Sequence, residues 1–305
     1  MTAITVTEVG PRDGLQNEAV VVPTALKIDF INALLQAGVR HVEVTSFVHP
    51  QRIPAMADAE EIYRADDRPD GVSLWALVPN LKGYERARSV DCRWVAVFTA
   101  ASEAFTRANI NMTIDESLER FRGIAARASA DGVKLRGYVS TVFSCPYSGP
   151  VAPAAVLPVV RALLEMGCFE VSLGDTIGVG TPVQTRRLLD ELVPAVGAER
   201  LALHFHDTWG MASANVFAAL EYGIVHFDSS AGGLGGCPYA PSATGNLASE
   251  DLLYLLDNLG YTTGIDLEQV TRAGELIASY LHRALPGRVH QAILARWKRQ
   301  SQTRR

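Results

Sequence analysis

The run "LALHFHD" at residues 201–207 has the composition of a buried strand and places two histidines one residue apart. Side chains alternate between the two faces of a strand, so residues at i and i+2 project from the same face. His204 and His206 are therefore predicted to point together into whatever that face encloses. Whether the pair does chemistry or packs in a core depends on the fold around it.

Seven other short runs rich in β-branched and aromatic residues alternate with longer helical patterns. The eight strand-like runs occupy residues 4–9, 40–46, 72–78, 93–99, 133–140, 169–175, 201–207 and 224–230. Several of the intervening helices close with glycine just before the next strand, as a helix C-terminus commonly does. Eight evenly spaced strand–helix units favour a closed (β/α)8 TIM barrel over a doubly wound open sheet.

We expect one domain, since no linker, internal repeat or low-complexity segment interrupts the 305 residues. The barrel is predicted to span about 4–260, with an eighth helix within 247–260. A C-terminal helical extension at about 262–300 is predicted to pack on the barrel.

Composition excludes several classes of function. A formal charge of −5 and a pI near 5.8 give no support for binding nucleic acid or an acidic membrane surface. The basic C-terminal "RWKRQSQTRR" is interpreted as a solvated tail, and no apolar run reaches the ~18 residues of a membrane span. Four widely separated cysteines and the lack of a secretory signal pattern predict reduced thiols in the cytoplasm.

In a TIM barrel the chemistry lies at the C-terminal ends of the strands, in the loops that lead to the helices. Polar residues collect at these positions in six of the eight units. They are Arg12, Asp13 and Gln16 after the first strand, Glu43, Thr45 and Ser46 on the second, Arg136 and Tyr138 on the fifth, Ser172, Asp175 and Thr176 on the sixth, His204 and His206 on the seventh, and Cys237 and Asn246 after the eighth.

Four of these residues form a set suited to a divalent cation. Asp13, His204, His206 and Asn246 offer two imidazoles, a carboxylate and an amide oxygen, and this mixture suits Mg²⁺ or Mn²⁺ better than a thiolate-bound structural zinc. Substrate oxygens could complete the octahedron. The alternative is that both histidines are structural.

Arg12 and Cys237 are the other informative residues. A fixed guanidinium can stabilise a developing enolate oxygen, whereas the alternative is a salt bridge at the barrel mouth. Cys237 lies in "GGLGGCPY", where glycines permit a loop to close, and a thiol there suits proton transfer. The alternative is an incidental thiol. The glycines do not form a known phosphate-binding pattern.

Five long motifs together resemble the 3-hydroxy-3-methylglutaryl-CoA lyase family. They are "EVGPRDGLQNE", "VEVTSFVHP", "SLGDTIGVGTP", "HFHDTWG" and "GGLGGCPYAPSATGNLASEDLLYLL", within a similarity that extends from about residue 4 to about 290. The related isopropylmalate and homocitrate synthases share the Arg-Asp and HxH patterns. They usually carry an extra domain, for which 305 residues leave little room.

The resemblance implies a metal-dependent retro-Claisen cleavage of 3-hydroxy-3-methylglutaryl-CoA to acetyl-CoA and acetoacetate, a step of leucine catabolism and ketone-body formation. It implies Asp13, His204, His206 and Asn246 as metal ligands, Arg12 as enolate stabiliser and Cys237 as the acid. Glu43, His204 and Asp175 complete the predicted catalytic set. Arg12, Gln16, Ser46, Arg136, Ser172 and Thr176 are expected to contact the acyl-CoA. The general base stays open among His204, Asp13 and Glu43, and a homodimer is compatible with the family.

The chain also departs from the family pattern. Ala19 replaces a common lysine, which weakens an expected contact to the CoA nucleotide. His49, Gln51, Arg52, Thr99, Ser144 and Trp209 replace the usual residues and predict an altered wall around the acyl group. The alternatives are therefore a lyase for citramalyl-CoA or a longer 3-alkyl-3-hydroxyglutaryl-CoA, a condensing synthase, and a non-catalytic metal-binding barrel. Intact Arg12, Glu43 and Cys237 argue against the last.

Overall fold

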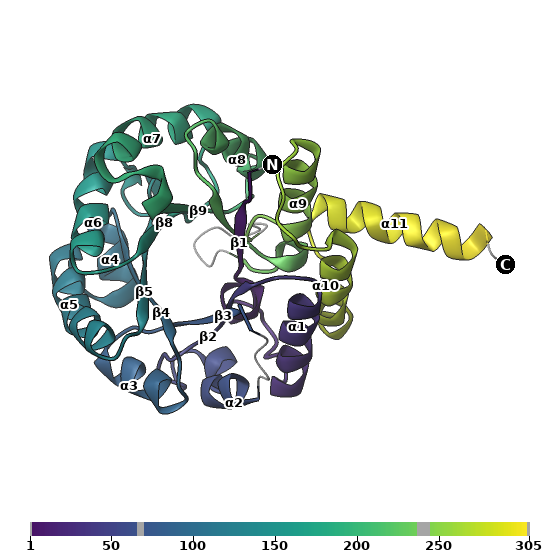
Figure 1. The fold of residues 1–305 in the computed structure, drawn as a ribbon, viewed down its shortest axis with the longest axis horizontal. Coiled ribbons are helices and arrows are strands. Elements are labelled where there is room, and N and C mark those ends of the chain that lie inside the picture. The colour runs from purple at the N-terminus through teal and green to yellow at the C-terminus, as the bar shows by residue number, and fades with distance from the viewer. Residues whose placement is uncertain (1, 66–69, 237–244, 304–305) are drawn as a thin grey trace.

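The computed structural model describes residues 2–65, 70–236 and 245–303 and confirms the predicted TIM barrel. Eight parallel strands close into a barrel in the order β1-β10-β9-β8-β5-β4-β3-β2, with a ring of helices outside (Figure 1). The barrel strands are β1 Thr5–Glu8, β2 His41–Ser46, β3 Ser73–Leu77, β4 Trp94–Ala100, β5 Lys134–Ser140, β8 Glu170–Asp175, β9 Leu201–Phe205 and β10 His226–Ser229. Each overlaps its predicted run, with ends that differ by two residues at most.

The helices alternate with the strands as predicted. They are α1 Thr24–Gln36, α2 Ala59–Arg64, α3 Leu81–Ser89, α4 Glu103–Ile110, α5 Ile114–Ala130, α6 Pro153–Glu165, α7 Pro182–Val196, α8 Ala212–Leu220 and α9 Ser249–Asn258, followed by α10 Leu267–Leu281 and α11 Arg288–Thr303. Helices α5 and α7 begin with capping boxes formed by Thr113 with Glu116 and by Thr181 with Gln184. Each box satisfies two backbone N–H groups that a helix start otherwise leaves free. A short hairpin, β6 Ser144–Cys145 and β7 Gly149–Pro150, lies between β5 and α6.

Strand alternation determines which side chains enter the barrel. On β5, Arg136 and Tyr138 point inward, where the Arg136 guanidinium lies 4.8 Å from the centre of the Trp75 ring and 4.9 Å from that of Tyr138. On β2 the alternation breaks, because the register with β3 shifts between Glu43 and Thr45. Such a bulge re-aims the side chains beyond it, and bulges are common beside active sites.

The C-terminal helical extension is present as predicted, but only part of it packs on the barrel. Helix α10 lies beside α1, and α11 starts against α9 and then projects away from the barrel (Figure 1). Only His290 and Ile293 of α11 are fully buried. Across the described residues, every helix is too short or too polar to cross a membrane.

Candidate active site

A tight turn after β1 carries the first two site residues. Gly10–Gly14 forms one turn of π-helix, in which the Val9 carbonyl accepts hydrogen bonds from the N–H groups of Arg12, Asp13 and Gly14 at 2.7–3.2 Å. Single π turns of this kind are frequent at functional sites. Gly10 is required here, because a Cβ would lie 2.6 Å from the Glu8 Oε1 that accepts the Gly10 N–H. The turn directs Arg12 and Asp13 over the C-terminal mouth of the barrel.

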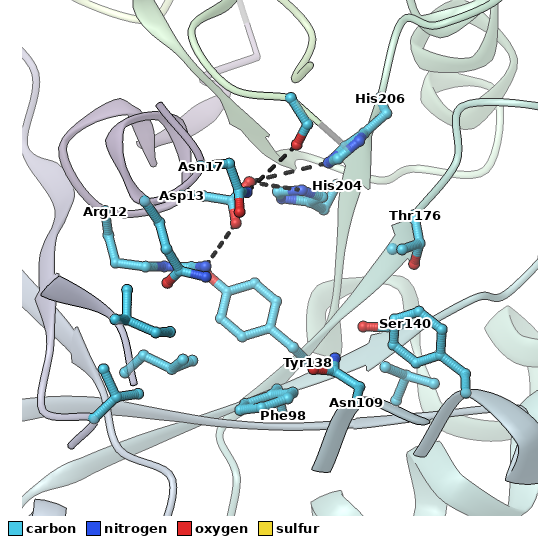
Figure 2. Close-up of a pocket in the computed structure, with 18 residues that line it drawn as sticks. Arg12, Asp13, Asn17, Phe98, Asn109, Tyr138, Ser140, Thr176, His204 and His206 are labelled. Atoms are coloured by element: carbon cyan, nitrogen blue, oxygen red, sulfur yellow. Dashed lines mark hydrogen bonds and ion pairs between the residues drawn. The ribbon is translucent and has the colours of Figure 1, made fainter. Parts of the chain in front are cut away.

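Asp13 and the two histidines converge at this mouth. Asp13 Oδ2 lies 3.9 Å from His204 Nε2 and 4.0 Å from His206 Nε2. One ligand atom from each residue can be chosen so that all three lie within 4.8 Å of one another. Both rings point toward the carboxylate in Figure 2. The i, i+2 spacing in the sequence therefore brings the histidines to the same point, as predicted.

The protonation states of Asp13 and His206 suit binding of a cation. Burial alone would raise the pKa of Asp13, but Arg12 and the histidines lower it to about 2, so the carboxylate is ionised at neutral pH. Burial lowers the pKa of His206 to about 4, which keeps that ring neutral. Metal ligands must present free lone pairs, and both residues do so without releasing a proton. For His204, burial alone would lower the pKa, but Asp228 and Asp13 raise it, so a proton on this ring would have to leave when a metal binds.

Unpaired polar atoms provide a separate test of whether a metal fits. Asn246 Nδ2 donates to Asp13 Oδ2 at 3.0 Å and to the Leu234 carbonyl at 3.1 Å. Asn246 Oδ1 is buried and, within the described part of the chain, accepts no hydrogen bond. A buried polar atom without a partner is costly unless something else satisfies it. The Asn246 side chain contacts Asp13 through Nδ2, and its unpaired Oδ1 is an oxygen donor that a divalent cation could use, so the residues fit the ion.

Arg12 joins the carboxylate of Asp13 to that of Glu43. Its Nη1 donates to Asp13 Oδ1 at 2.6 Å, and its Nε donates to Glu43 Oε2 at 2.7 Å. Burial raises the pKa of Glu43, and the guanidinium opposes that rise. The salt bridge that was the alternative for Arg12 is present, and the same guanidinium lines the cavity.

A cavity opens directly above these residues (Figure 2). Its polar lining includes Arg12, Asp13, His204 and His206, and the predicted contact residues Gln16 and Thr176 also line it. Its apolar lining includes Val48, Ile53, Leu77, Phe98, Phe105 and Val139. A partly apolar substrate with polar groups fits such a lining.

Six of the predicted site residues that the structure describes do not line the cavity. Glu43 and Asn246 contact Arg12 and Asp13 from behind, and the other four make contacts elsewhere. Ser46 donates to the Leu77 carbonyl at 3.3 Å. Arg136 and Ser172 lie deeper in the barrel and both donate to Asp228. Asp175 accepts the N–H groups of Val179 and Gly180 and so shapes the loop after β8. Burial raises the pKa of Asp175 to about 6 while these N–H groups oppose the shift.

Two other expectations concern the loops and the acyl wall. Cys237 lies outside the described residues. The prediction of an altered wall around the acyl group is wrong, because none of the positions expected to form that wall lines the cavity. Thr99 points outward from β4 and hydrogen-bonds Ser117 of α5 at 2.7 Å, since strand alternation gives the inward position to Phe98. Trp209 is 69% exposed. His49, Gln51 and Arg52 are exposed, and Ser144 is half-buried in β6.

Sequence reasoning missed Asp228 and gave Tyr138 no role. Asp228 is fully buried on β10, where its Oδ2 lies 3.3 Å from His204 Nδ1. Tyr138 lines the cavity, and its hydroxyl accepts from Arg136 Nη1 at 2.8 Å. The signal for Asp228 was present, because His226 and Asp228 follow the same i, i+2 rule that selected His204 and His206.

Fold and site together define a TIM-barrel protein with a candidate metal centre at the C-terminal mouth of its strands. The model of the HMGL-like family matches residues 3–277, and the chain belongs to that family. Over 98% of its length the chain is 52% identical to the whole of the hydroxymethylglutaryl-CoA lyase of Pseudomonas mevalonii.

Two further similarities come from Pseudomonas aeruginosa. The chain is 51% identical over 95% of its length to 96% of a 3-hydroxy-3-isohexenylglutaryl-CoA/hydroxymethylglutaryl-CoA lyase. The crystal structure of a hydroxymethylglutaryl-CoA lyase from this organism superposes with a TM-score of 0.95 at 50% identity, covering 97% of this chain and 98% of that one. Fold, family and site residues therefore point to the same chemistry.

Proposed function

We propose that this protein is a carbon–carbon lyase that cleaves 3-hydroxy-3-methylglutaryl-CoA to acetyl-CoA and acetoacetate. The observation that carries the proposal is the convergence of Asp13, His204 and His206 beside the Arg12–Glu43 pair at the mouth of one cavity. Two relatives that are about 50% identical to this chain, and that match it over nearly their whole length, are named for this activity.

Asp13, His204, His206 and Asn246 would hold a divalent cation, Mg²⁺ or Mn²⁺. Such an ion, when bound, orients the substrate hydroxyl and carboxylate oxygens and lowers the pKa of the hydroxyl. The mixed nitrogen and oxygen donors support this class of metal over a thiolate-bound ion.

Arg12 is proposed to stabilise the charge that develops when the substrate is cleaved. As the C2–C3 bond breaks, negative charge grows on the thioester oxygen, and a guanidinium fixed by two carboxylates can stabilise that charge without reorganising. Glu43 fixes Arg12 and is itself a candidate for the base that removes the hydroxyl proton. His204 and Asp13 are the other candidates. Cys237 is proposed to protonate the enolate carbon.

Partners and setting follow from the reaction. The acyl-CoA enters with its acyl end toward Asp13, past Gln16 and Thr176, and no nucleic acid or membrane is involved. We infer a cytoplasmic enzyme of leucine breakdown and ketone-body formation, supported by the widely separated cysteines and by the product acetoacetate. A homodimer is proposed from the family resemblance.

Metal dependence is the first test. Purified protein is incubated with 3-hydroxy-3-methylglutaryl-CoA, and acetyl-CoA is measured after chelation and after addition of Mg²⁺ or Mn²⁺. Chelation should abolish turnover, either ion should restore it, and His206→Ala should lose metal and activity together. Full turnover by metal-free protein in excess chelator would show that the site assignment is wrong.

The same assay with a panel of substrates addresses specificity. Citramalyl-CoA and a 3-hydroxyglutaryl-CoA with a longer 3-alkyl group serve as competitors. We expect the 3-methyl compound to have the highest kcat/KM, because the family departures lie away from the cavity. A preference of a hundredfold, about 2.7 kcal/mol, would show that those departures are neutral. A higher kcat/KM for a competitor would contradict the proposed substrate.

A further inference from the structure

His204 uses its two ring nitrogens differently. Nε2 faces the candidate metal site, where Asp13 Oδ2 lies 3.9 Å away. Nδ1 faces the barrel interior, where Asp228 Oδ2 lies 3.3 Å away. An ionised carboxylate only accepts hydrogen bonds, so the proton of a neutral His204 belongs on Nδ1, and Nε2 keeps its lone pair.

Asp228 is held so that it cannot turn away. Arg136 Nη2 donates to its Oδ1 at 2.8 Å, and Ser172 Oγ donates to its Oδ2, also at 2.8 Å. All three side chains are fully buried. Arg136 is itself held by the aromatic rings of Trp75 and Tyr138, which lie 4.8 and 4.9 Å from its guanidinium. Arg136 on β5 and Ser172 on β8 thus clamp Asp228 on β10, and Asp228 contacts His204 on β9.

His206 has no such support. Its Nδ1 is buried and, among the described residues, has no hydrogen-bond partner. Asp228 thus favours one position of the ring proton on His204, whereas no described residue does so for His206. Carboxylates behind metal-binding histidines set the tautomer and orient the ring, and their loss typically weakens metal binding 10–100-fold.

We propose that Asp228, clamped by Arg136 and Ser172, is a positioning residue that fixes His204 as the Nδ1–H tautomer and aims Nε2 at the metal site. This inference deepens the proposed function, since it rests on the metal site that the function requires. It also gives Arg136 and Ser172 a role other than the substrate contact expected for them. They act on His204 through Asp228.

The variant Asp228→Asn tests the role of the carboxylate. The Arg136 guanidinium would hold the amide oxygen, which turns the NH₂ group toward His204 Nδ1. That donor favours the opposite tautomer, with the proton on Nε2, where it blocks metal binding. We expect the Kd for Mn²⁺, measured by EPR on the variant without substrate, to rise 10–100-fold.

Glu170→Gln is the matched control. Glu170 is also a buried carboxylate in contact with Arg136, but the histidine that it touches is His226, at 2.6 Å from Nδ1. We expect its Kd for Mn²⁺ to stay within about threefold of the wild-type value, which corresponds to about 0.7 kcal/mol. Equal weakening by both variants would mean that any loss of buried charge disturbs the site, and it would overturn the specific role of Asp228.

A measurement on the unaltered protein does not depend on how any variant folds. In metal-free protein labelled with ¹⁵N-histidine, at an alkaline pH where the ring is neutral, the His204 Nδ1 should show the chemical shift of a protonated nitrogen. A protonated Nε2 would overturn the proposal. Normal Mn²⁺ binding with no lyase turnover would instead refute the proposed function and leave the role of Asp228 standing.

Discussion

Arg12 combines a structural role that its contacts show with a chemical role that we propose. Its guanidinium binds Asp13 and Glu43 on adjacent elements, and together the two carboxylates hold its plane toward the cavity. An arginine presents several donors in a rigid fork, whereas lysine offers one compact charge. For the proposed enolate-stabilising role, the geometry of this fork should therefore matter more than the charge alone.

The prediction at this position separates geometry from charge. Arg12→Lys should lower kcat by roughly 10²-fold or more, as removal of an oxyanion donor does, because charge on the substrate oxygen grows only as the bond breaks. Arg12→Gln should be worse, with metal still bound, since Asp13 and the histidines remain. Steady-state kinetics and Mn²⁺ binding measure the two effects. A higher KM with unchanged kcat would contradict an enolate-stabilising role.

Strand parity explains which residues were predictable from the sequence. The i, i+2 rule brought His204 and His206 to one point, and the position after β1 brought Asp13 to them. The same rule, applied to β4, would have turned Thr99 away from the cavity. Depth along a strand was the missing information, because Arg136 has the right parity but lies below the mouth, where Asp228 binds it.

At the scale of elements, the connection from β10 to α9 depends on the backbone freedom of Gly235. Its φ is +125°, and a Cβ there would lie 2.8 Å from the Asn246 Nδ2. Its neighbour Gly236 has, among the described residues, no atom within 4 Å of such a Cβ, and its φ lies outside the positive region. These adjacent glycines form a matched pair, because only the first is needed to place a candidate metal ligand.

We therefore expect Gly235→Ala to raise the Kd for Mn²⁺ at least tenfold and to lower turnover, since the backbone strain and the displaced Asn246 act together. Gly236→Ala should leave the Kd for Mn²⁺ near its wild-type value. Calorimetric titration of both variants compares them directly. If Gly235→Ala bound Mn²⁺ normally, Asn246 would not belong to the metal site.

The elements themselves were the most predictable part of the fold. Each barrel strand is an apolar run bounded by turn residues, and the helices between them bury one face, so periodicity alone located all eight units. The bulge on β2 could not be predicted, because it follows from the register with β3 and leaves no mark in the local pattern. Neither Glu43 nor Ser46 lines the cavity, but Glu43, before the bulge, contacts Arg12, whereas Ser46, beyond it, donates to the Leu77 carbonyl.

At the scale of the whole molecule, buried ionisable side chains connect the C-terminal extension to the segment that follows β10. Glu250 at the start of α9 accepts the Gly232 N–H at 2.7 Å through Oε2, and its Oε1 lies 2.8 Å from His290 Nδ1. His290 Nε2 lies 3.0 Å from Glu275 Oε1 of α10. One imidazole thus joins α9, α10 and α11 beneath the segment that leads from β10.

This arrangement predicts a large stability effect at His290 and a small one further along α11. His290→Ala removes the imidazole that pairs with the buried carboxylate of Glu250 and should lower the free energy of unfolding by about 3 kcal/mol. Arg296→Ala removes an ion pair with Glu268 in which both side chains are about half-exposed, so its cost should stay within about 0.5 kcal/mol. Urea unfolding at pH 6 measures both differences.

The pH dependence of the His290 effect follows from the direction of its shift. Burial alone would lower the pKa of His290, but Glu250 and Glu275 raise it above 6.5. A raised pKa means that the folded state binds the proton more tightly, so the stabilisation is complete below pH 6.5 and is lost as pH rises through the raised value. The gap in unfolding free energy between wild type and His290→Ala should therefore be larger at pH 6 than at pH 9. A gap that grew with pH would mean that His290 is held as a neutral ring, and that packing rather than charge connects the extension to the barrel.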